Sequence, residues 1–179
     1  ELAAMAHRSA AQGLAPAALG CLSLRLGAYD FLITQGGVAL NAMQPGQIVR
    51  IRQGCREPGP EPHASAVVHR AIYLADPVTA AIVMAQPRDL MAFAVAGVKP
   101  DVRTIPESWI LLRDLPLLPA GSPLADPDGF ARRFGSTCTT VRTAPSIPKR
   151  ICTPSDRPIQ LRCMVATCSG QPGSFSRSS

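Results

Sequence analysis

The sequence predicts a mixed α/β domain in which helices flank a central, mostly antiparallel sheet. Short apolar segments of strand length and longer segments with helical spacing follow one another without a regular strand–helix–strand repeat. The chain of 179 residues is 46% hydrophobic, which suffices for the core of one domain. No apolar run approaches the length of a membrane span, so we expect no membrane partner.

The first 62 residues are predicted to form one helix and three short strands. The helix covers residues 1–12, an alanine-rich segment, and Gly13 suits the position after its C-terminus. Apolar runs predict strands at 22–24, 31–33 and 48–51. Turns are expected between and after them, at 27–30, at Gly36–Gly37 and over 53–62.

The following segment alternates between helices and strands. A helix is predicted over residues 65–74, and it should end at Asp76–Pro77, because the residue before a proline avoids the helical region. We expect a buried strand at 80–83, a helix over 87–96 that ends at Gly97, and an extended segment at 105–119.

Several sequence blocks occur in a characteristic order. They read GLAP (13–16), GCLSLR (20–25), FLITQGGV (31–38), PGQIVRI (45–51), EP (61–62), HRAIY (69–73) and AAIVMAQP (80–87). Over about residues 1–125 these blocks resemble the class II aldolase and adducin-head family, and L-fuculose-phosphate aldolase-like proteins within it. The resemblance implies a layered α/β fold, zinc-dependent cleavage of a small sugar phosphate, and a homotetramer with its site between subunits.

The metal ligands of that family are replaced here. Its strand signature is His-x-His-Pro, and Met84 and Gln86 stand at the two histidine positions. A thioether is soft and uncharged, and an amide oxygen is a poor zinc ligand. The second zinc-ligand block of the family, Asn-His-Gly, is not visible after Phe134. We therefore expect no metal cofactor; zinc is expected only if the family chemistry persists.

The catalytic carboxylate implied by the resemblance is also absent. Ser65 occupies the position of the family's glutamate, four residues before His69. A serine cannot shuttle a proton at neutral pH without an activating base. We therefore expect Ser65 to be catalytically inactive and to serve as the N-cap of the helix that begins there.

The resemblance also implies three loops that bind a phosphate. By position these are Gly20 with Cys21, Gly36 with Gly37, and His63 with Ala64. Cys21 replaces the usual asparagine, and His63 and Ala64 replace paired serines. The glycine amides could still bind a small anionic ligand. The alternative is that the glycines serve only as turn residues.

The histidines offer one further possibility. His63 and His69 are six residues apart, which does not align them on one helical face. A rearranged metal site that includes Cys21 is conceivable, but a packed or hydrogen-bonded His69 and a solvated His7 are the preferred interpretation. Met84 and Gln86, on one face of a strand, would fill the vacated site.

Composition changes at about residue 130. Residues 1–130 carry 10 basic and 11 acidic side chains, whereas residues 131–179 carry 8 basic and 1 acidic, together with four of the six cysteines. The basic charges are scattered among Ser, Thr and Pro without a helical stripe, so no nucleic-acid partner is expected. The cysteine spacings match no zinc ribbon.

We interpret residues 1–130 as the family domain, C-terminally incomplete, and residues 131–179 as a basic tail rich in Ser, Pro and Cys. The tail is expected to be either disordered or translated out of frame. In the second hypothesis, back-translation of residues 142–147 in a shifted frame permits the string DGAFY, which suits a strand and turn.

Two functions remain from the sequence. The first is a catalytically silent scaffold or binding module that has lost zinc-dependent aldolase chemistry. The second is an aldolase, or a related lyase or epimerase, acting on a small sugar phosphate or keto acid; Met84, Gln86 and Ser65 argue against it. A product of a decaying gene without selected function is a third possibility. No signal-peptide pattern is visible, so a cytoplasmic location is expected. A homo-oligomer is expected because the family resemblance implies one.

Overall fold

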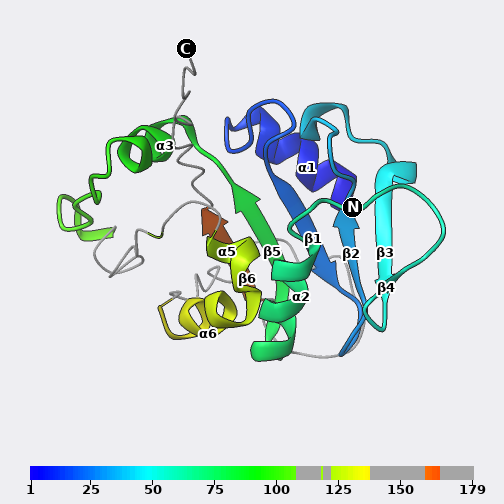
Figure 1. Ribbon diagram of the computed structural model, residues 1–179. Coiled ribbons are helices and arrows are strands. Elements are labelled where there is room, and N and C mark those ends of the chain that lie inside the picture. Colours follow the sequence, from blue (N-terminus) through cyan, green and yellow to red (C-terminus); the bar gives the residue numbers. More distant parts are fainter. Residues whose placement is uncertain (108–117, 119–121, 138–159, 166–179) are drawn as a thin grey trace, which may run out of the picture.

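A computed structural model describes residues 1–107, 118, 122–137 and 160–165, with side chains up to residue 133 (Figure 1). Its centre is a sheet in the order β4-β3-β2-β1-β5-β6. The strands are β1 (Cys21–Arg25), β2 (Phe31–Thr34), β3 (Ile48–Arg52), β4 (Cys55–Arg56), β5 (Thr79–Ala85) and β6 (Gln160–Val165). Neighbours from β4 to β5 pair antiparallel, and β6 pairs parallel to β5. The predicted mixed α/β fold with a mostly antiparallel sheet is confirmed.

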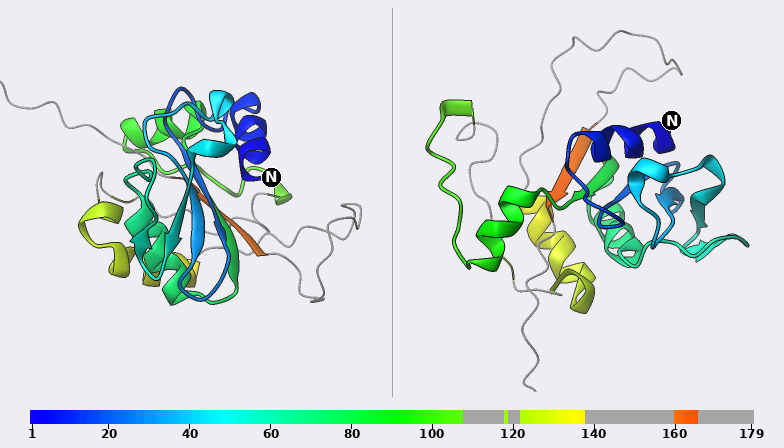
Figure 2. Two further views of the ribbon diagram at one scale, coloured as in Figure 1. Left: turned by 90° about the vertical axis from the view of Figure 1, so that its right-hand side faces the viewer. Right: turned by 90° about the horizontal axis from the view of Figure 1, so that it is seen from above.

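Helices cover both faces of this sheet. They are α1 (Leu2–Ala11), α2 (Ala66–Ala75), α3 (Arg88–Val95), α5 (Ser122–Ala125) and α6 (Pro127–Thr137), with 3-10 turns η1 (Leu40–Ala42) and η2 (Pro45–Gln47). Figure 2 shows α1 on one side of the strands and α2 with α6 on the other. In the described part of the chain, no helix is long and apolar enough to cross a membrane.

The alternation of side chains along the strands creates two cores. In β1, Cys21 is buried in the cluster beneath α2, whereas Leu22 is buried in the cluster beneath α1. In β5, Met84 joins the first cluster and Val83 packs against the second. This is the period of two that a strand imposes. The side chains of Cys21, Ser23 and Met84 therefore all lie on the α2 face.

The helix α2 lies on this face because its apolar side chains recur with helical spacing. Its buried residues include Val68, His69, Ile72 and Tyr73, whereas Val67 and Leu74 remain exposed. The guanidinium of Arg25 donates to the carbonyl oxygens of Tyr73 and Asp76 at the C-terminal end of α2. β1 and α2 are thereby fixed to each other at this end.

Gly20 illustrates a position that only glycine can occupy. Its φ is +142°, and a Cβ at this position would lie 2.7 Å from the Cβ of Ala15 and 3.1 Å from the carbonyl oxygen of Met84. The backbone that enters β1 therefore passes directly over the end of β5, which brings Cys21 opposite Met84.

The structure differs from the sequence predictions in several segments. The loop over 53–62 contains the short strand β4, and residues 40–47 contain two 3-10 turns that the sequence did not predict. Beyond residue 130, α6 continues to Thr137 and β6 forms, although we predicted no regular structure there. Glycines at 129 and 135 weaken the helical pattern of α6, and β6 stands alone in a segment rich in Ser, Pro and Arg, so neither was recognised from the sequence. The division at residue 130 stays a prediction.

Some predictions concern residues that lie outside the described part of the chain. The extended segment predicted at 105–119 lies mostly outside the described residues, as do the tail cysteines apart from the backbone of Cys163. The hypothesis of a shifted reading frame at residues 142–147 also concerns residues outside the described part.

Candidate functional site

Three of the predicted site residues, Cys21, Ser65 and His63, meet at the N-terminal end of α2 together with His69, where the first turn of the helix lies over the start of β1. The buried thiol of Cys21 lies 3.0 Å from Ser65 Oγ and 3.2 Å from His69 Nε2. His63 lies on the outer side of Ser65, with Nδ1 2.8 Å from the same hydroxyl. Sequence positions 21, 63, 65 and 69 thus form one hydrogen-bonded cluster.

The outer end of this cluster determines how the protons are arranged. The Ser65 amide donates to His63 Nδ1 at 3.2 Å, so Nδ1 must hold a lone pair and the ring proton sits on Nε2. The Ser65 hydroxyl can donate to the same nitrogen, which leaves its oxygen to accept from the Cys21 thiol.

At the inner end of the cluster the hydrogen bonds donate in the same direction, towards His63. Cys21 Sγ accepts from His69 Nε2–H, and His69 Nδ1 accepts from the Ser23 hydroxyl at 2.7 Å. Ser23 Oγ in turn accepts from the Tyr73 hydroxyl at 2.7 Å. Each donor therefore has an acceptor. Among the described residues, the only buried side-chain nitrogen or oxygen without a partner is Arg25 Nε, which lies outside this chain of hydrogen bonds.

Burial keeps the whole cluster neutral. Desolvation lowers the pKa of His69 to about 3, and the charge of a protonated His63 acts in the same direction. Burial raises the pKa of the Cys21 thiol to about 12, against a smaller opposite effect of its hydrogen bond with Ser65. The pKa of His63 is lowered and that of Tyr73 is raised, both chiefly by desolvation. At neutral pH no member carries a charge.

The predicted N-cap role of Ser65 is wrong in one respect. Ser65 does occupy the N-cap position of α2, but its side chain makes no capping hydrogen bond. Its hydroxyl instead contacts His63 and Cys21, because the buried thiol and the imidazole need partners more than the helix amides do. The prediction that His69 is a hydrogen-bonded, buried helix residue is confirmed. His7 is exposed, as predicted, and its Nε2 lies 2.8 Å from the carbonyl oxygen of Met43.

The predicted anion site is only partly assembled. Gly36 lies against His63, since a Cβ on Gly36 would be 3.3 Å from the His63 Cα, and Gly37 has a positive φ of 73°. The amide of Gly36, however, already donates to the carbonyl oxygen of Glu61 at 3.1 Å. Gly20 lies against Ala15, and the thiol of Cys21 is fully buried. Binding of a small anion at this site stays a prediction.

The two residues at the family's histidine positions do not fit a zinc ion. Met84 is buried in the core beneath α2. Gln86 is buried just after β5, where its backbone N–H donates to the carbonyl oxygen of Leu14. Neither a thioether nor a neutral amide suits Zn²⁺. Across the described residues, no group of three or more His, Cys, Asp or Glu side chains could hold a metal.

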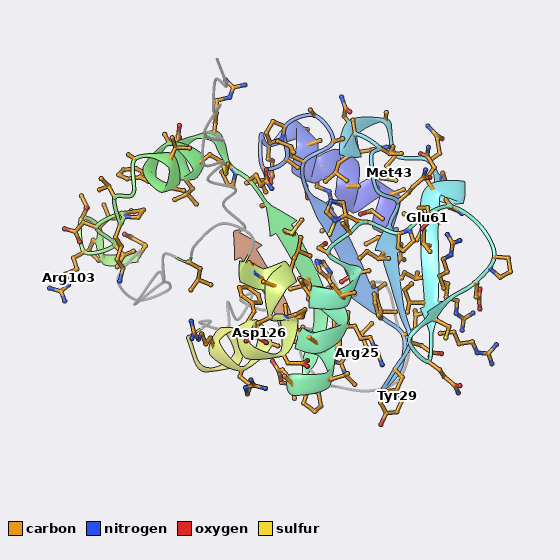
Figure 3. All side chains as sticks on the ribbon, in the orientation of Figure 1. Arg25, Tyr29, Met43, Glu61, Arg103 and Asp126 are labelled. Atoms are coloured by element: carbon orange, nitrogen blue, oxygen red, sulfur yellow. The ribbon has the colours of Figure 1, made fainter. Side chains whose placement is uncertain are left out.

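Sequence reasoning missed Ser23, Tyr73 and Arg25. A signal was present, because Ser23 is two residues after Cys21 on a strand and Tyr73 is four after His69 on a helix. Each pair therefore shares a face. Figure 3 shows Arg25 at the lower end of α2, where its guanidinium lies 4.7 Å from the centre of the Tyr73 ring.

A separate surface cavity of about 420 Å³ lies beside α1. It is lined by His7, Asn41 and Pro16 together with alanines, and none of the predicted site residues lines it. The cluster around Ser65 is closed to solvent because Cys21, Ser65 and His69 are buried, and half-buried His63 forms its outer end.

This architecture, with an antiparallel sheet between α1 and α2 and a site at the N-terminal end of α2, defines a class II aldolase-type domain. The sequence profile of the Class II Aldolase and Adducin N-terminal domain matches residues 1–137. The chain belongs to this family. Comparison with curated proteins finds no match.

Solved structures agree with this assignment. The chain is 25% identical to YgbL of Klebsiella pneumoniae, a candidate aldolase/epimerase/decarboxylase, with a TM-score of 0.62 over 74% of this chain and 69% of that one. It is 26% identical to L-fuculose-1-phosphate aldolase of Thermus thermophilus, with a TM-score of 0.57 over 72% and 68%.

Proposed function

We propose that this protein is a class II aldolase-type scaffold that has lost zinc-dependent aldolase chemistry and serves as a binding module. The observation that carries this proposal is the environment of Met84. It occupies a family histidine position, is only 7% exposed, and packs in the core beneath α2. A thioether is soft and uncharged and does not suit Zn²⁺, so Met84 supplies no zinc ligand at this position.

A second feature supports the same proposal. The glutamate that the family uses for acid/base work is replaced by Ser65, whose hydroxyl is enclosed between His63 and Cys21. Family membership supplies the fold, whereas activity depends on the site itself. The ligand we propose is a small anion, bound at the glycine loops around Gly36, Gly37 and His63.

The test is zinc binding together with aldol cleavage. Protein purified without chelator should contain no stoichiometric zinc by elemental analysis, and calorimetric titration of Zn²⁺ should show no tight site. L-fuculose 1-phosphate, the substrate named for the Thermus thermophilus enzyme, should not be cleaved. One tightly bound zinc per chain, or metal-dependent cleavage, would overturn the proposal.

A residual lyase or epimerase, acting on a small sugar phosphate or keto acid, is the second candidate. It is favoured by His63, whose Nδ1 is 2.8 Å from Ser65 Oγ and could act as the base that serine chemistry requires. Activity that resists chelators and is lost in both Ser65→Ala and His63→Gln would select this candidate. Loss of this activity in only one of the two variants would argue against a catalytic pair of Ser65 and His63.

The assembly we propose is a cytoplasmic homo-oligomer, a tetramer by analogy with the family. Apolar side chains are exposed on α3 and just after it, with Phe93, Val95 and Val98 at 42%, 71% and 52%. Figure 1 shows α3 to one side of the sheet. A second copy of the chain would cover this surface, and light scattering coupled to size exclusion measures the resulting mass.

A further inference from the structure

The core beneath α2 contains three buried side chains whose donor atoms, two sulfurs and an imidazole nitrogen, suit a soft metal ion. They are the thiol of Cys21, the thioether of Met84 and the Nε2 of His69. We propose that these three side chains form a binding site for a monovalent soft metal ion, Cu(I), with Ag(I) as its redox-inert counterpart.

The geometry of the strands places two of the donors side by side. Cys21 on β1 and Met84 on β5 are register partners in an antiparallel pair, so their side chains leave the same face of the sheet. Opposite residues of such a pair have Cβ atoms about 5 Å apart. Both side chains belong to the one core cluster beneath α2.

The third donor comes from the helix above them. His69 is fully buried, and its Nε2 lies 3.2 Å from Cys21 Sγ. Two ligands of one metal ion stand slightly farther apart than a hydrogen-bonded pair, so binding requires this distance to widen by a few tenths of an ångström. To bind the ion, Nε2 must release its proton, which passes to Nδ1, so that the ring stays neutral. Ser23 Oγ then accepts from Nδ1–H, its own hydroxyl turns towards Tyr73 Oη, and the ring keeps its orientation.

Ligand chemistry selects a soft ion for this site. Thiolate and thioether sulfur favour Cu(I), whereas carboxylate and water favour hard ions, and imidazole accepts copper as well. Among the described residues, no Asp or Glu is buried. A hard divalent ion would therefore find no oxygen anion in this core.

Charge balance selects a monovalent ion. The cluster is neutral, and binding replaces the thiol proton of Cys21 by the metal ion, while the proton leaves to solvent. The thiolate charge of −1 then cancels the +1 of Cu(I), so the buried site stays neutral and no electron is transferred. A divalent ion would leave one uncompensated positive charge in the core, which is costly.

His63 and Ser65 provide a path to the buried thiol. His63 is half-buried at the surface, its Nδ1 contacts Ser65 Oγ, and Ser65 contacts Cys21 Sγ. An entering ion can bind the imidazole of His63 first and then exchange to the thiol as the first turn of α2 opens. The outermost polar group on this path, the imidazole of His63, is thus itself a ligand for Cu(I).

The experiment is anaerobic titration with Cu(I), added as its acetonitrile complex, in competition with the chelator bathocuproine disulfonate. The full chain is used with the other five cysteines (Cys55, Cys138, Cys152, Cys163 and Cys168) changed to serine, so that Cys21 is the only thiol. We expect one Cu(I) per chain, with X-ray absorption showing both sulfur and nitrogen neighbours. Zn²⁺ should not displace it.

Matched variants separate this site from incidental binding. Met84→Leu should weaken Cu(I) binding at least tenfold, whereas Met43→Leu, which changes a buried methionine beneath α1, should leave it unchanged. His69→Gln should weaken binding, and His7→Gln should not. Circular dichroism verifies the fold of each variant. Equal effects of Met84→Leu and Met43→Leu, or absorption spectra without sulfur neighbours in the parent chain, would overturn the proposal.

Discussion

At the scale of single residues, the hydrogen-bonded chain from His63 to Tyr73 explains why several polar groups can be buried beneath α2. Ser23, Ser65 and His69 are each no more than 5% exposed. Such burial is tolerable because every donor has an acceptor and no group is charged. A network of this kind is sensitive, since the loss of one member leaves its neighbours without partners.

Ser23→Ala tests this sensitivity. The substitution removes the partner of both His69 Nδ1 and the Tyr73 hydroxyl, and each unsatisfied group costs about 1–3 kcal/mol. We expect the free energy of unfolding, measured in urea, to fall by at least about 2 kcal/mol. Ser9→Ala is the control, because the Ser9 hydroxyl contacts only its own helix, and it should cost under about 1 kcal/mol. Equal losses would contradict the role of the network.

The lowered pKa of His69 predicts acid sensitivity. In the unfolded chain His69 binds a proton below its ordinary value of 6.5, whereas in the folded protein it stays neutral down to about pH 3. The unfolded state therefore binds more protons between these values, and stability falls as pH falls through this window, by at most about 1.4 kcal/mol per pH unit. His63, whose pKa is also lowered, adds to the effect.

Unfolding in urea at several pH values between about 4 and 7 measures this slope. His69→Gln cannot bind a proton at this position, so its stability should depend less steeply on pH over the same range. A slope that His69→Gln leaves unchanged would assign the acid sensitivity to other groups.

At the scale of elements, the site depends on how the chain enters β1. The loop before β1 must pass close to Ala15 and to the end of β5, and Gly20 makes this possible. At the other end of β1, Arg25 binds the C-terminal carbonyls of α2. The first contact sets the position of β1 beside β5, and the second holds the C-terminal end of α2 over β1.

Gly20→Ala tests the first of these contacts. The new Cβ would lie 2.7 Å from Ala15 Cβ, and the φ of +142° is unfavourable for alanine, so we expect a loss of more than about 2 kcal/mol in the free energy of unfolding. Gly37→Ala is a matched control. Its φ is also positive, at 73°, but nothing lies within 4 Å of the new Cβ, so it should cost only about 1 kcal/mol. A larger loss of unfolding free energy in Gly37→Ala than in Gly20→Ala would show that Gly20 and Ala15 do not lie this close in solution.

At the scale of the whole molecule, the exposed apolar surface on α3 and just after it requires an explanation. A homo-oligomer that covers Phe93, Val95 and Val98 would provide one. We expect Val95→Glu to lower the mass in light scattering towards that of the 18.9 kDa monomer, because a charge would be buried at the interface. Val78→Glu, at an exposed turn before β5, is the control. An unchanged mass in Val95→Glu would place any interface elsewhere.

Much of the fold followed from the sequence. The strand pattern, the helix over α2 and its end at Asp76–Pro77 were predictable, because alternation and proline act locally. The strand β4 and the 3-10 turns at 40–47 were not, since they are short and depend on tertiary contacts: β4 pairs with β3, and η1 packs against α1. Of the site, Cys21, His63 and Ser65 could be named from their positions in the family-like blocks, whereas His69 was predicted only as a packed or hydrogen-bonded helix residue.

The sequence by itself determined the family and the chemical groups at three positions of interest: a hydroxyl at Ser65, a thioether at Met84 and an amide at Gln86. These are statements about which chemical groups are present. Only the tertiary structure decided what those groups do. The Ser65 hydroxyl could cap α2 or bind Cys21 and His63, and the packing of α2 on β1 selected the second. Partners in the cluster lie up to 50 residues apart in the chain, so local patterns carry no information about their distance.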